Sequence, residues 1–393
     1  MTGSAILDLA LLAMLGVYTV LGFRHGFVLS LGTFAGVIAG GVAAFFSIPI
    51  LTAWVTDSQI RLPVILAVVV GLLTIGQSAG SAIGKIIRRR VDKTPLRVLD
   101  RIFGAAINLV AAAVIVSLLA FGLGSLGVPL VTKAIGASNV VSTIETFTPD
   151  PLKVLEARVR SMFVLDGLPR LIETISNGNP LPVPASGESA AQQLSARSVV
   201  KITGNAFKCG QNQSGSGFVV SPGRVITNAH VVAGVAEPMV LTTMGTAYVG
   251  RVVYFDPERD LAVIAVNGLP APALRVDNDL ATGDKAVFAG YPLGGPFRAS
   301  PAAVQNVATI TTADIYGNNP ATRQVYYLAG DVQQGNSGGP LIDSTGGVTG
   351  VIFARSASKP QLGFAMTTHE FAPVAAKAKA LSATVSSGSC TRD

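Results

Sequence analysis

The chain has 393 residues, of which 49% are hydrophobic and only 13% are charged, and its formal net charge is +7. This length allows two or three domains, and the positive mean hydropathy indicates membrane-spanning segments rather than a wholly soluble protein. Both halves of the chain share the basic charge, so we do not expect a nucleic-acid-binding protein.

Four apolar stretches occupy the first third of the chain. Each is close to the ~20 residues that a helix needs to cross a bilayer. The first is followed too soon by the second, and lacks the basic start, to be a cleaved signal peptide. We therefore predict four transmembrane helices, at Ala5–Phe23, Phe27–Ile50, Leu62–Ile83 and Phe103–Val128.

Glycines recur every four residues in the second and third predicted spans. Small residues at this spacing allow helices to approach closely in lipid. A compact bundle is the simpler interpretation, and a substrate path is the alternative. The pattern resembles the colicin V production family of membrane proteins. The glycines are Gly32, Gly36, Gly40, Gly76, Gly80 and Gly84.

Positive charge predicts the orientation of the bundle. The loop predicted between the third and fourth spans carries seven basic residues, and basic loops remain cytoplasmic. The short Arg24–Gly26 turn falls on the same side, so both termini are expected outside. Binding of anionic lipid is a compatible alternative role for the cluster. Its members are Lys85, Arg88, Arg89, Arg90, Lys93, Arg97 and Arg101.

The middle of the chain, residues 129–193, is more polar. Apolar residues at helical spacing predict amphipathic helices at Pro151–Phe163 and Leu168–Ile175. The stretch Ser176–Ser189 is rich in Pro, Gly, Ser and Asn and is predicted to be a linker. Because exposed linkers are where proteases cut, self-cleavage there is a hypothesis.

From Ser198 the pattern changes to short strands separated by turn residues, which predicts antiparallel barrels. A helix is expected at Pro373–Leu381. The predicted strands are Ser198–Thr203, Ser216–Ser221, Arg224–Asn228, Ala247–Phe255, Leu261–Val266, Lys285–Gly290, Ala303–Thr311, Gln324–Leu328, Leu341–Asp343, Val348–Ala354 and Gly363–Thr367.

A G-N-S-G-G-P stretch at Gly335–Pro340 carries the chemistry. A serine hydroxyl becomes an effective nucleophile when a tight turn presents it beside a base and backbone N–H groups face the developing oxyanion. We predict Ser337 as the nucleophile. The amides of Gly335 and Ser337 are predicted to form the oxyanion hole.

The base must be one of three histidines. His230 ends an apolar strand in a small-residue turn and is the natural candidate, whereas His25 and His369 read as structural and surface residues. Asp260 precedes an apolar strand and is the predicted orienting acid; Asp256, in a turn context, is its rival. The order His230, Asp260, Ser337 is the chymotrypsin order of the triad.

Three motifs, T-N-A-H-V-V, D-L-A-V-I and G-N-S-G-G-P, together resemble the trypsin-like serine proteases, especially the bacterial HtrA-type branch. The resemblance covers roughly residue 196 to the C-terminus. It implies two six-stranded barrels with the active site between them. His230 and Asp260 would come from the first barrel and Ser337 from the second.

The two cysteines, Cys209 and Cys390, flank the predicted catalytic residues. A pair that brackets a domain favours a disulfide in an oxidising compartment, with unpaired thiols as the alternative. This agrees with the orientation predicted from charge.

Specificity is predicted less sharply. The resemblance puts Asp331 at the base of the pocket for the substrate side chain, which would favour Arg or Lys, but Arg355 could neutralise it. Asn336 replaces the aspartate with which the digestive enzymes bind their new N-terminus, and no I-V-G-G-like start is present. Activation by N-terminal insertion is therefore not expected, and no PDZ-like segment follows.

Four spans followed by a cysteine-bracketed trypsin-like domain resemble the membrane-anchored mycobacterial acid-resistance protease family, MarP. That resemblance implies a periplasmic protease needed for tolerance of acid and oxidative stress. It also implies that a Cys209–Cys390 bridge supports activity under oxidising conditions.

These observations predict a multi-domain protein: a four-helix transmembrane bundle at residues 1–128, amphipathic helices and a linker at residues 129–193, and an all-β chymotrypsin-like double β-barrel at residues 194–393. The predicted function is a membrane-anchored serine endopeptidase that cleaves protein substrates outside the cytoplasmic membrane, without cofactor, metal or nucleic acid. The alternatives are a catalytically silent protease-fold binding module and a transport or pore bundle with an external regulatory domain. Only Asp8, Tyr18 and Gln77 interrupt the spans with strongly polar groups, so an ion path has weak support.

Overall fold

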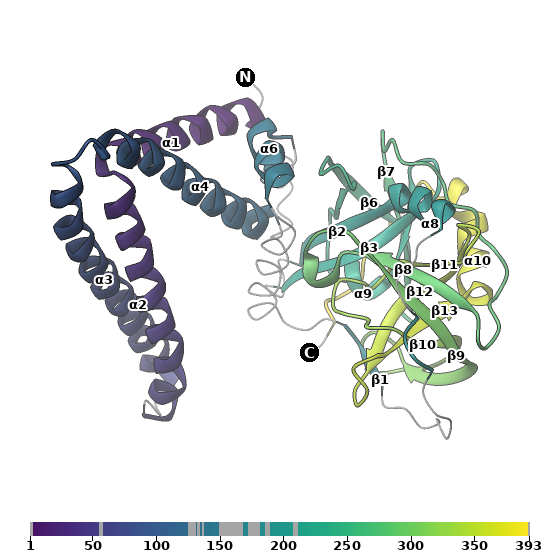
Figure 1. Ribbon diagram of the computed structural model, residues 1–393. Helices are drawn as coiled ribbons and strands as arrows, with labels where there is room; N and C mark the ends of the chain where they lie inside the picture. The colour runs from purple at the N-terminus through teal and green to yellow at the C-terminus, as the bar shows by residue number, and fades with distance from the viewer. Residues whose placement is uncertain are drawn as a thin grey trace. The chain divides into compact units, whose positions relative to one another are not determined.

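The computed structural model divides into two compact units, Ile6–Ser117 in one and Leu118–Asp393 with Met1–Ala5 in the other (Figure 1). It describes residues 3–54, 58–124, 131, 134–135, 137–148, 168–171, 181–184, 189–206 and 211–391. The predicted helix Pro151–Phe163 and Cys209 lie outside the described residues, as does most of the predicted linker.

The first unit contains helices long and apolar enough to cross a membrane. Within the described residues there are four such helices, which confirms the predicted number of spans. The third helix begins four residues before its predicted apolar stretch and ends eight residues after it. The helices are α1 (Gly3–His25), α2 (Phe27–Trp54), α3 (Ser58–Val91) and α4 (Arg97–Gly124).

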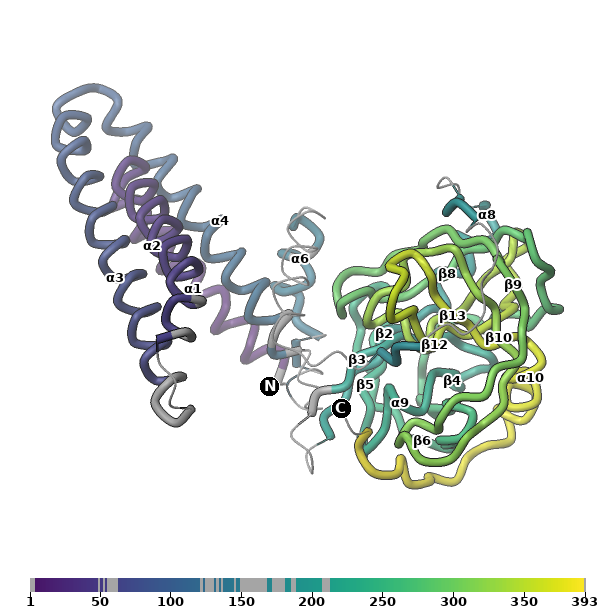
Figure 2. Tube along the Cα trace, turned by 90° about the horizontal axis from the view of Figure 1, so that it is seen from below, coloured from purple at the N-terminus to yellow at the C-terminus, as the bar shows by residue number. Residues whose placement is uncertain are grey.

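The two glycine stripes face each other where α2 and α3 run side by side (Figure 2). A Cβ on Gly32 would lie 2.6 Å from the Gly80 carbonyl oxygen, and one on Gly80 would lie 2.9 Å from the Gly36 Cα. Because those approaches are too close for any side chain, only glycine permits this helix pair.

The basic cluster between Lys85 and Arg101 lies at the same end of this unit as the Arg24–Gly26 turn. The Arg88 guanidinium donates a hydrogen bond to the Arg24 carbonyl, 2.7 Å away. The Val28 N–H, in the first turn of α2, donates to the Asp100 carboxylate at 3.0 Å. The predicted basic loop was too long, however: most of its charges lie on the ends of α3 and α4, because both helices continue beyond their apolar stretches.

The second unit contains a closed six-stranded barrel, in the order β2-β3-β4-β7-β6-β5. All its pairings are antiparallel. The predicted strands are present, and one short strand, β5, was not predicted. The strands are β2 (Val199–Ala206), β3 (Gln211–Ser221), β4 (Arg224–Thr227), β5 (Met239–Leu241), β6 (Ala247–Asp256) and β7 (Leu261–Val266).

A seven-stranded sheet follows, in the order β1-β12-β11-β8-β9-β10-β13. An additional β12–β13 pairing closes six of these strands into a second ring, as predicted. The strands are β8 (Lys285–Gly290), β9 (Arg298–Ala313), β10 (Pro320–Ala329), β11 (Pro340–Ile342), β12 (Val348–Ser356), β13 (Leu362–Thr367) and β1 (Arg170–Leu171).

Strand β1 corrects the predicted helix at Leu168–Ile175, whose described part is extended. The Arg355 and Ala357 amides donate to the Pro169 and Leu171 carbonyls at 3.1 and 2.9 Å, in a parallel pairing with β12. Leu168 is buried in the second barrel. An open strand edge and an apolar pocket thus outweigh the local helical spacing. A strand from the predicted middle region therefore completes the sheet of the second unit.

The helices of this unit are short. The C-terminal helix begins earlier than predicted, at Thr368, and η4 continues it to Ala380, one residue short of the predicted end. Phe371 of α10 packs edge-on against Phe218 in a core cluster. The helices are α6 (Asn139–Phe147), α8 (Ala190–Ser195), η1 (Ala196–Ser198), α9 (Ala229–Val232), η3 (Pro292–Gly294), α10 (Thr368–Lys377) and η4 (Ala378–Ala380).

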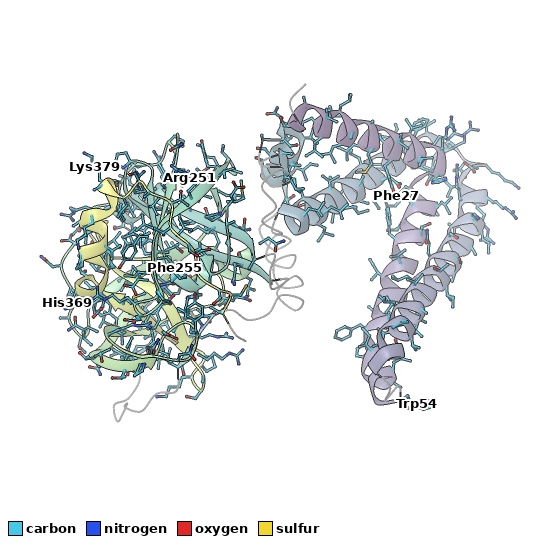
Figure 3. All side chains as sticks on the ribbon, turned by 180° about the vertical axis from the view of Figure 1, so that it is seen from behind. Phe27, Trp54, Arg251, Phe255, His369 and Lys379 are labelled. Carbon is cyan, nitrogen blue, oxygen red and sulfur yellow. The ribbon has the colours of Figure 1, made fainter. Side chains whose placement is uncertain are left out.

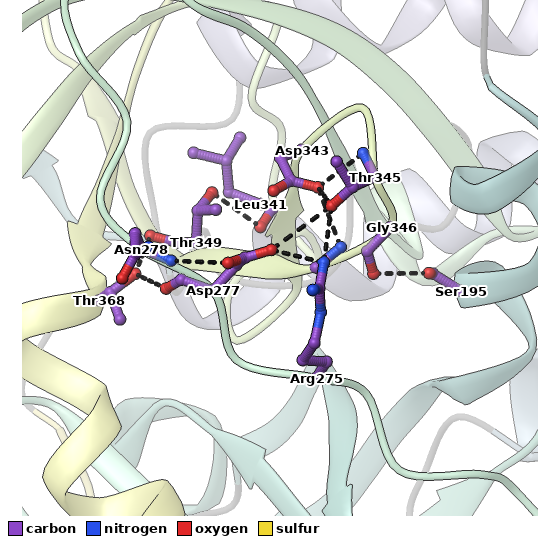
Figure 4. A network of polar contacts seen from close by, with 11 residues as sticks. Ser195, Arg275, Asp277, Asn278, Leu341, Asp343, Thr345, Gly346, Thr349 and Thr368 are labelled. Atoms are coloured by element: carbon purple, nitrogen blue, oxygen red, sulfur yellow. Dashed lines mark hydrogen bonds and ion pairs between the residues drawn. The ribbon is translucent and has the colours of Figure 1, made fainter.

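A polar network ties the connection between the two barrels to the second barrel (Figure 4). Arg275 forms an ion pair with Asp277 at 2.6 Å and donates to Thr345 at 2.8 Å. Asp343 accepts from the Thr345 amide, and Thr368 donates to the Asp277 carbonyl. These contacts fix the path by which the chain leaves one barrel and enters the other.

Candidate active site

His230 and Asp260 form a buried pair in the first barrel. The His230 Nδ1 lies 2.8 and 3.0 Å from the two carboxylate oxygens of Asp260, and the His230 backbone N–H donates to the same carboxylate at 2.9 Å. Only 6% of His230 and 1% of Asp260 is exposed. The carboxylate therefore fixes the imidazole plane and leaves Nε2 as the nitrogen free to exchange a proton.

Asp260 is held in a conformation that non-glycine residues rarely adopt, with φ = 56°. The Asn228 side-chain amide donates to the Asp260 carbonyl at 2.9 Å. The rival residue, Asp256, accepts hydrogen bonds from the Glu258 and Arg259 amides and shapes the turn before Asp260. A strained residue persists only where its surroundings over-determine it, which is common at functional sites.

Ser337 is presented by a turn between β10 and β11 that lies against the strand leading to His230. Its carbonyl accepts the Ser216 N–H at 2.7 Å. The position that a Cβ on Gly338 would occupy is 3.0 Å from the Asn228 nitrogen, so only glycine, with φ = 79°, allows the two segments to meet. The turn and the histidine-bearing segment are thus in contact.

The third contact of a catalytic triad is not formed in this structure. The His230 Nε2 and the Ser337 Oγ are both buried, and neither has a hydrogen-bond partner among the described residues. In enzymes without substrate, catalytic hydrogen bonds are often long and tighten only in the complex. Neither atom is therefore committed to another hydrogen bond among the described residues.

The direction of the Gly335 amide is set by how its peptide plane is held. The Leu293 N–H donates to the Gln334 carbonyl at 2.6 Å. Since C=O and N–H point in opposite directions across a trans peptide, the Gly335 N–H points away from Leu293. Within the described residues, the Gly335 and Ser337 amides donate no hydrogen bond to a backbone carbonyl. They are therefore available to an oxyanion.

Asn336 closes the same loop locally. Its side-chain oxygen accepts the Gln333 N–H at 2.9 Å, and its own N–H donates to the Gln333 carbonyl at 3.0 Å. These two bonds hold the loop from within, in addition to the bonds that it receives from Leu293 and Ser216. This explains physically how asparagine can stand where the digestive enzymes carry an aspartate.

A cavity of about 460 Å³ opens beside the histidine and aspartate. Phe353 and Arg323 form part of its wall, and the guanidinium of Arg323 lies 5.7 Å from the Phe353 ring centroid. Asp314 also lines it. Burial acts to raise the pKa of the Asp314 carboxyl, but hydrogen bonds from Asn318, Asn319 and Tyr316 outweigh burial and lower it.

The two residues proposed for specificity do not line this cavity. Asp331 is exposed, and its carboxylate accepts a hydrogen bond from Gln333 at 2.7 Å. Arg355 is half-buried on β12, where its N–H bonds to Pro169. A basic preference therefore stays a prediction.

The remaining predicted residues lie elsewhere. His369 is exposed on α10, as Figure 3 shows, and His25 is exposed at the end of α1. Cys390 is disulfide-bonded. Its predicted partner, Cys209, lies outside the described residues. No group of three or more His, Cys, Asp or Glu side chains that could hold a metal occurs among the described residues.

Sequence reasoning missed the residues that support the site. Asn228 holds the Asp260 carbonyl, Leu293 holds the Gln334 carbonyl, and Ser216 contacts both Gly335 and Ser337. The only sequence signal for Ser216 is its place between two glycines at the start of an apolar run. No sequence signal identifies Leu293, because its contact with the loop is made by its backbone N–H and not by its side chain.

Two family models match the chain: Colicin V production protein over residues 7–149 and Trypsin-like peptidase domain over residues 215–351. Serine protease Rv3671c of Mycobacterium tuberculosis H37Rv is 35% identical over 397 residues, covering 99% of this chain and all of that protein. Protease Do-like 1 of Arabidopsis thaliana is 30% identical over 162 residues, which are 39% of this chain and 36% of that protein.

Among solved structures, the active form of the M. tuberculosis Rv3671c protease is similar to this chain with a TM-score of 0.50 and 38% identity. The match covers 56% of this chain and all of that structure. The similarity supports the double-barrel architecture. The relative that is similar in sequence is therefore also similar in its folded structure.

Proposed function

Because the chain belongs to the family of membrane serine proteases that join a Colicin V production region to a trypsin-like peptidase domain, we propose that it hydrolyses peptide bonds through His230, Asp260 and Ser337. The enzyme class follows from that membership. The assignment of the residues is supported above all by the buried Asp260–His230 pair beside the turn that carries Ser337.

The proposed mechanism assigns one task to each group. The Ser337 Oγ attacks the substrate carbonyl, and the His230 Nε2 takes its proton. Asp260 orients the imidazole and stabilises the imidazolium. The Gly335 and Ser337 amides bind the oxyanion of the tetrahedral intermediate. His230 then protonates the leaving amine, and water releases the acyl group by the same steps.

Labelling with a fluorophosphonate probe tests this assignment on the full-length protein in detergent. We expect wild type to be labelled and Ser337→Ala not to be. Asp260→Asn should lower the kcat for casein by about 10⁴-fold, because the imidazole loses its orienting carboxylate. Ser344→Ala, at an exposed serine seven positions further along, is the matched control and should behave as wild type.

Two outcomes would overturn the assignment. Casein cleavage by Ser337→Ala at the wild-type rate would show that another nucleophile acts. Absence of both labelling and turnover in wild type would favour the alternative of a catalytically silent binding module.

The proposed location of the protease domain is the periplasmic side of the membrane. The basic residues at one end of the helical unit support a cytoplasmic position for that end. A disulfide between Cys209 and Cys390 would be compatible with an oxidising compartment.

The proposed role is resistance to acid and oxidative stress, which the resemblance to MarP-type proteases suggests. A strain lacking the protein, complemented with wild type or with Ser337→Ala, tests it. Survival of acid exposure only with wild type is expected; equal survival with both would remove proteolysis from that role.

A further inference from the structure

Ser216, in β3 of the first barrel, contacts the second barrel through both its hydroxyl and its backbone N–H. Its Oγ donates to the Gly335 carbonyl at 2.6 Å and accepts the Tyr291 N–H at 2.9 Å. Its backbone N–H donates to the Ser337 carbonyl at 2.7 Å, and its carbonyl accepts the Thr227 hydroxyl at 2.8 Å. The residue is fully buried.

These contacts restrain both peptide planes that meet at Gly335. The carbonyl before it, that of Gln334, accepts the Leu293 N–H, and its own carbonyl accepts the Ser216 hydroxyl. Gly335 has φ = 89°, a conformation that glycine enters and leaves without steric cost. Without a restraint on each side, the Gly335 amide could therefore rotate out of its present direction.

We propose that Ser216 is a positioning residue for the oxyanion hole: its hydroxyl locks the Gly335 carbonyl and the Tyr291 amide together, and so keeps the Gly335 N–H aimed at the substrate carbonyl. The inference rests on the proposed triad and deepens it. It explains how the hole is formed in a chain whose Asn336 cannot make the ion pair of the digestive enzymes.

The loop that bears Leu293 is anchored from the first barrel as well. The buried Lys201 on β2 donates its ammonium to the Gly294 carbonyl. Leu293 itself has φ = 57°, an unfavourable conformation for leucine. Two residues of the first barrel, Ser216 and Lys201, thus hold the two segments that determine the direction of one amide in the second.

The test compares Ser216→Ala with Ser198→Ala in the full-length protein. Ser198 is also fully buried, and its hydroxyl has no hydrogen-bond partner among the described residues. We expect Ser216→Ala to lower the kcat for casein by about 10²-fold, as loss of one oxyanion donor does. KM should stay within about twofold of the control, because the fully buried Ser216 side chain does not touch the substrate.

A second readout isolates the oxyanion hole. 2-Phenylethylboronic acid accepts the Ser337 Oγ at boron, while the serine proton passes to His230, and the resulting tetrahedral anion directs an oxygen at the hole. The matched 3-phenylpropanamide cannot form this adduct. We expect Ser216→Ala to weaken boronate binding by about 10²-fold and amide binding not at all.

Equal kcat and boronate affinity in Ser216→Ala and Ser198→Ala would overturn the inference. Should Ser216→Ala fail to unfold cooperatively, Lys201→Met decides the question. A smaller loss of kcat and of boronate affinity, with amide binding unchanged, supports the inference. Unchanged kcat and boronate affinity in Lys201→Met overturn it. Turnover that persists in Ser337→Ala would instead refute the proposed triad, so the two failures are distinguishable.

Discussion

At the scale of single residues, the proposed catalytic centre depends on backbone conformations that few residues can adopt. Gly335 has φ = 89°, Gly338 has φ = 79°, and Asp260 has φ = 56°. Each lies where a chain reversal places a reacting group or a hydrogen-bond donor. The glycines adopt these conformations freely, whereas Asp260 is held there by Asn228 and by its bond to His230.

Gly335→Ala is expected to inactivate the enzyme. An alanine Cβ at this φ would be strained and would meet the Tyr291 carbonyl, so the loop must move and the amide must turn. We expect kcat to fall by about 10²–10³-fold, measured with casein. Gly283→Ala is the control: it has φ = 95° but open space around its Cβ. It should lower the Tm while kcat stays at the wild-type value.

Asp314 should contribute a pH-dependent part of the stability. Its pKa is lowered in the folded state, so its stabilising effect is present above the unfolded pKa, about 3.9, and is lost as pH falls through the folded pKa. We expect Asp314→Asn to lower the Tm by about 2–4 °C at pH 7, and the difference to shrink as the pH falls below about 4, towards the lowered pKa of the folded state. Thermal unfolding across pH measures it. The control Asp284→Asn, at an exposed position, should lower the Tm less. A Tm difference between Asp314→Asn and wild type that does not change with pH would refute the explanation.

At the scale of elements, two contacts between elements have different causes. One depends on glycines, which have no side chain, and the other on backbone groups of a strand that had no hydrogen-bond partner. The α2–α3 pair requires bare backbone at the glycine stripe, and β1 finds its partners on the open edge of β12. Helical spacing in the sequence is informative for the first interface and misleading for the second. The end of β12 extends beyond its pairing with β11 and leaves backbone groups for β1, which no local pattern in the sequence reveals.

Gly36→Leu should separate α2 from α3. Its Cβ would lie 2.9 Å from the Gly76 carbonyl carbon, so overpacking should cost about 1–3 kcal/mol. Heat-induced aggregation of the protein in detergent should begin at a lower temperature. Gly71→Leu on α3 has open space at its Cβ and is the matched control. Identical behaviour of the two variants would show that the stripe does not hold the pair together.

At the scale of the whole molecule, the charge distribution makes the orientation testable. The basic ends of α3 and α4 should remain cytoplasmic, and four spans would then put Asp393 outside. Alkaline phosphatase fused after Asp393 should be active, and the same reporter inserted between Asp92 and Leu96 should be inactive. Reversed activities would place the protease domain in the cytoplasm.

The sequence by itself determined the four spans, most strands of the barrels and the three motif residues, because hydropathy, alternation and turn chemistry are local properties of the chain. Family membership then came from similarity along its full length. The pairing of β1 with β12, the bonds from Ser216 and Leu293 to the loop of Gly335, and the position of Asp331 outside the cavity were decided only by the tertiary structure. Each depends on contacts between segments that are distant in sequence. Every residue except proline has the same backbone amide, so the sequence does not show which distant group that amide will bond.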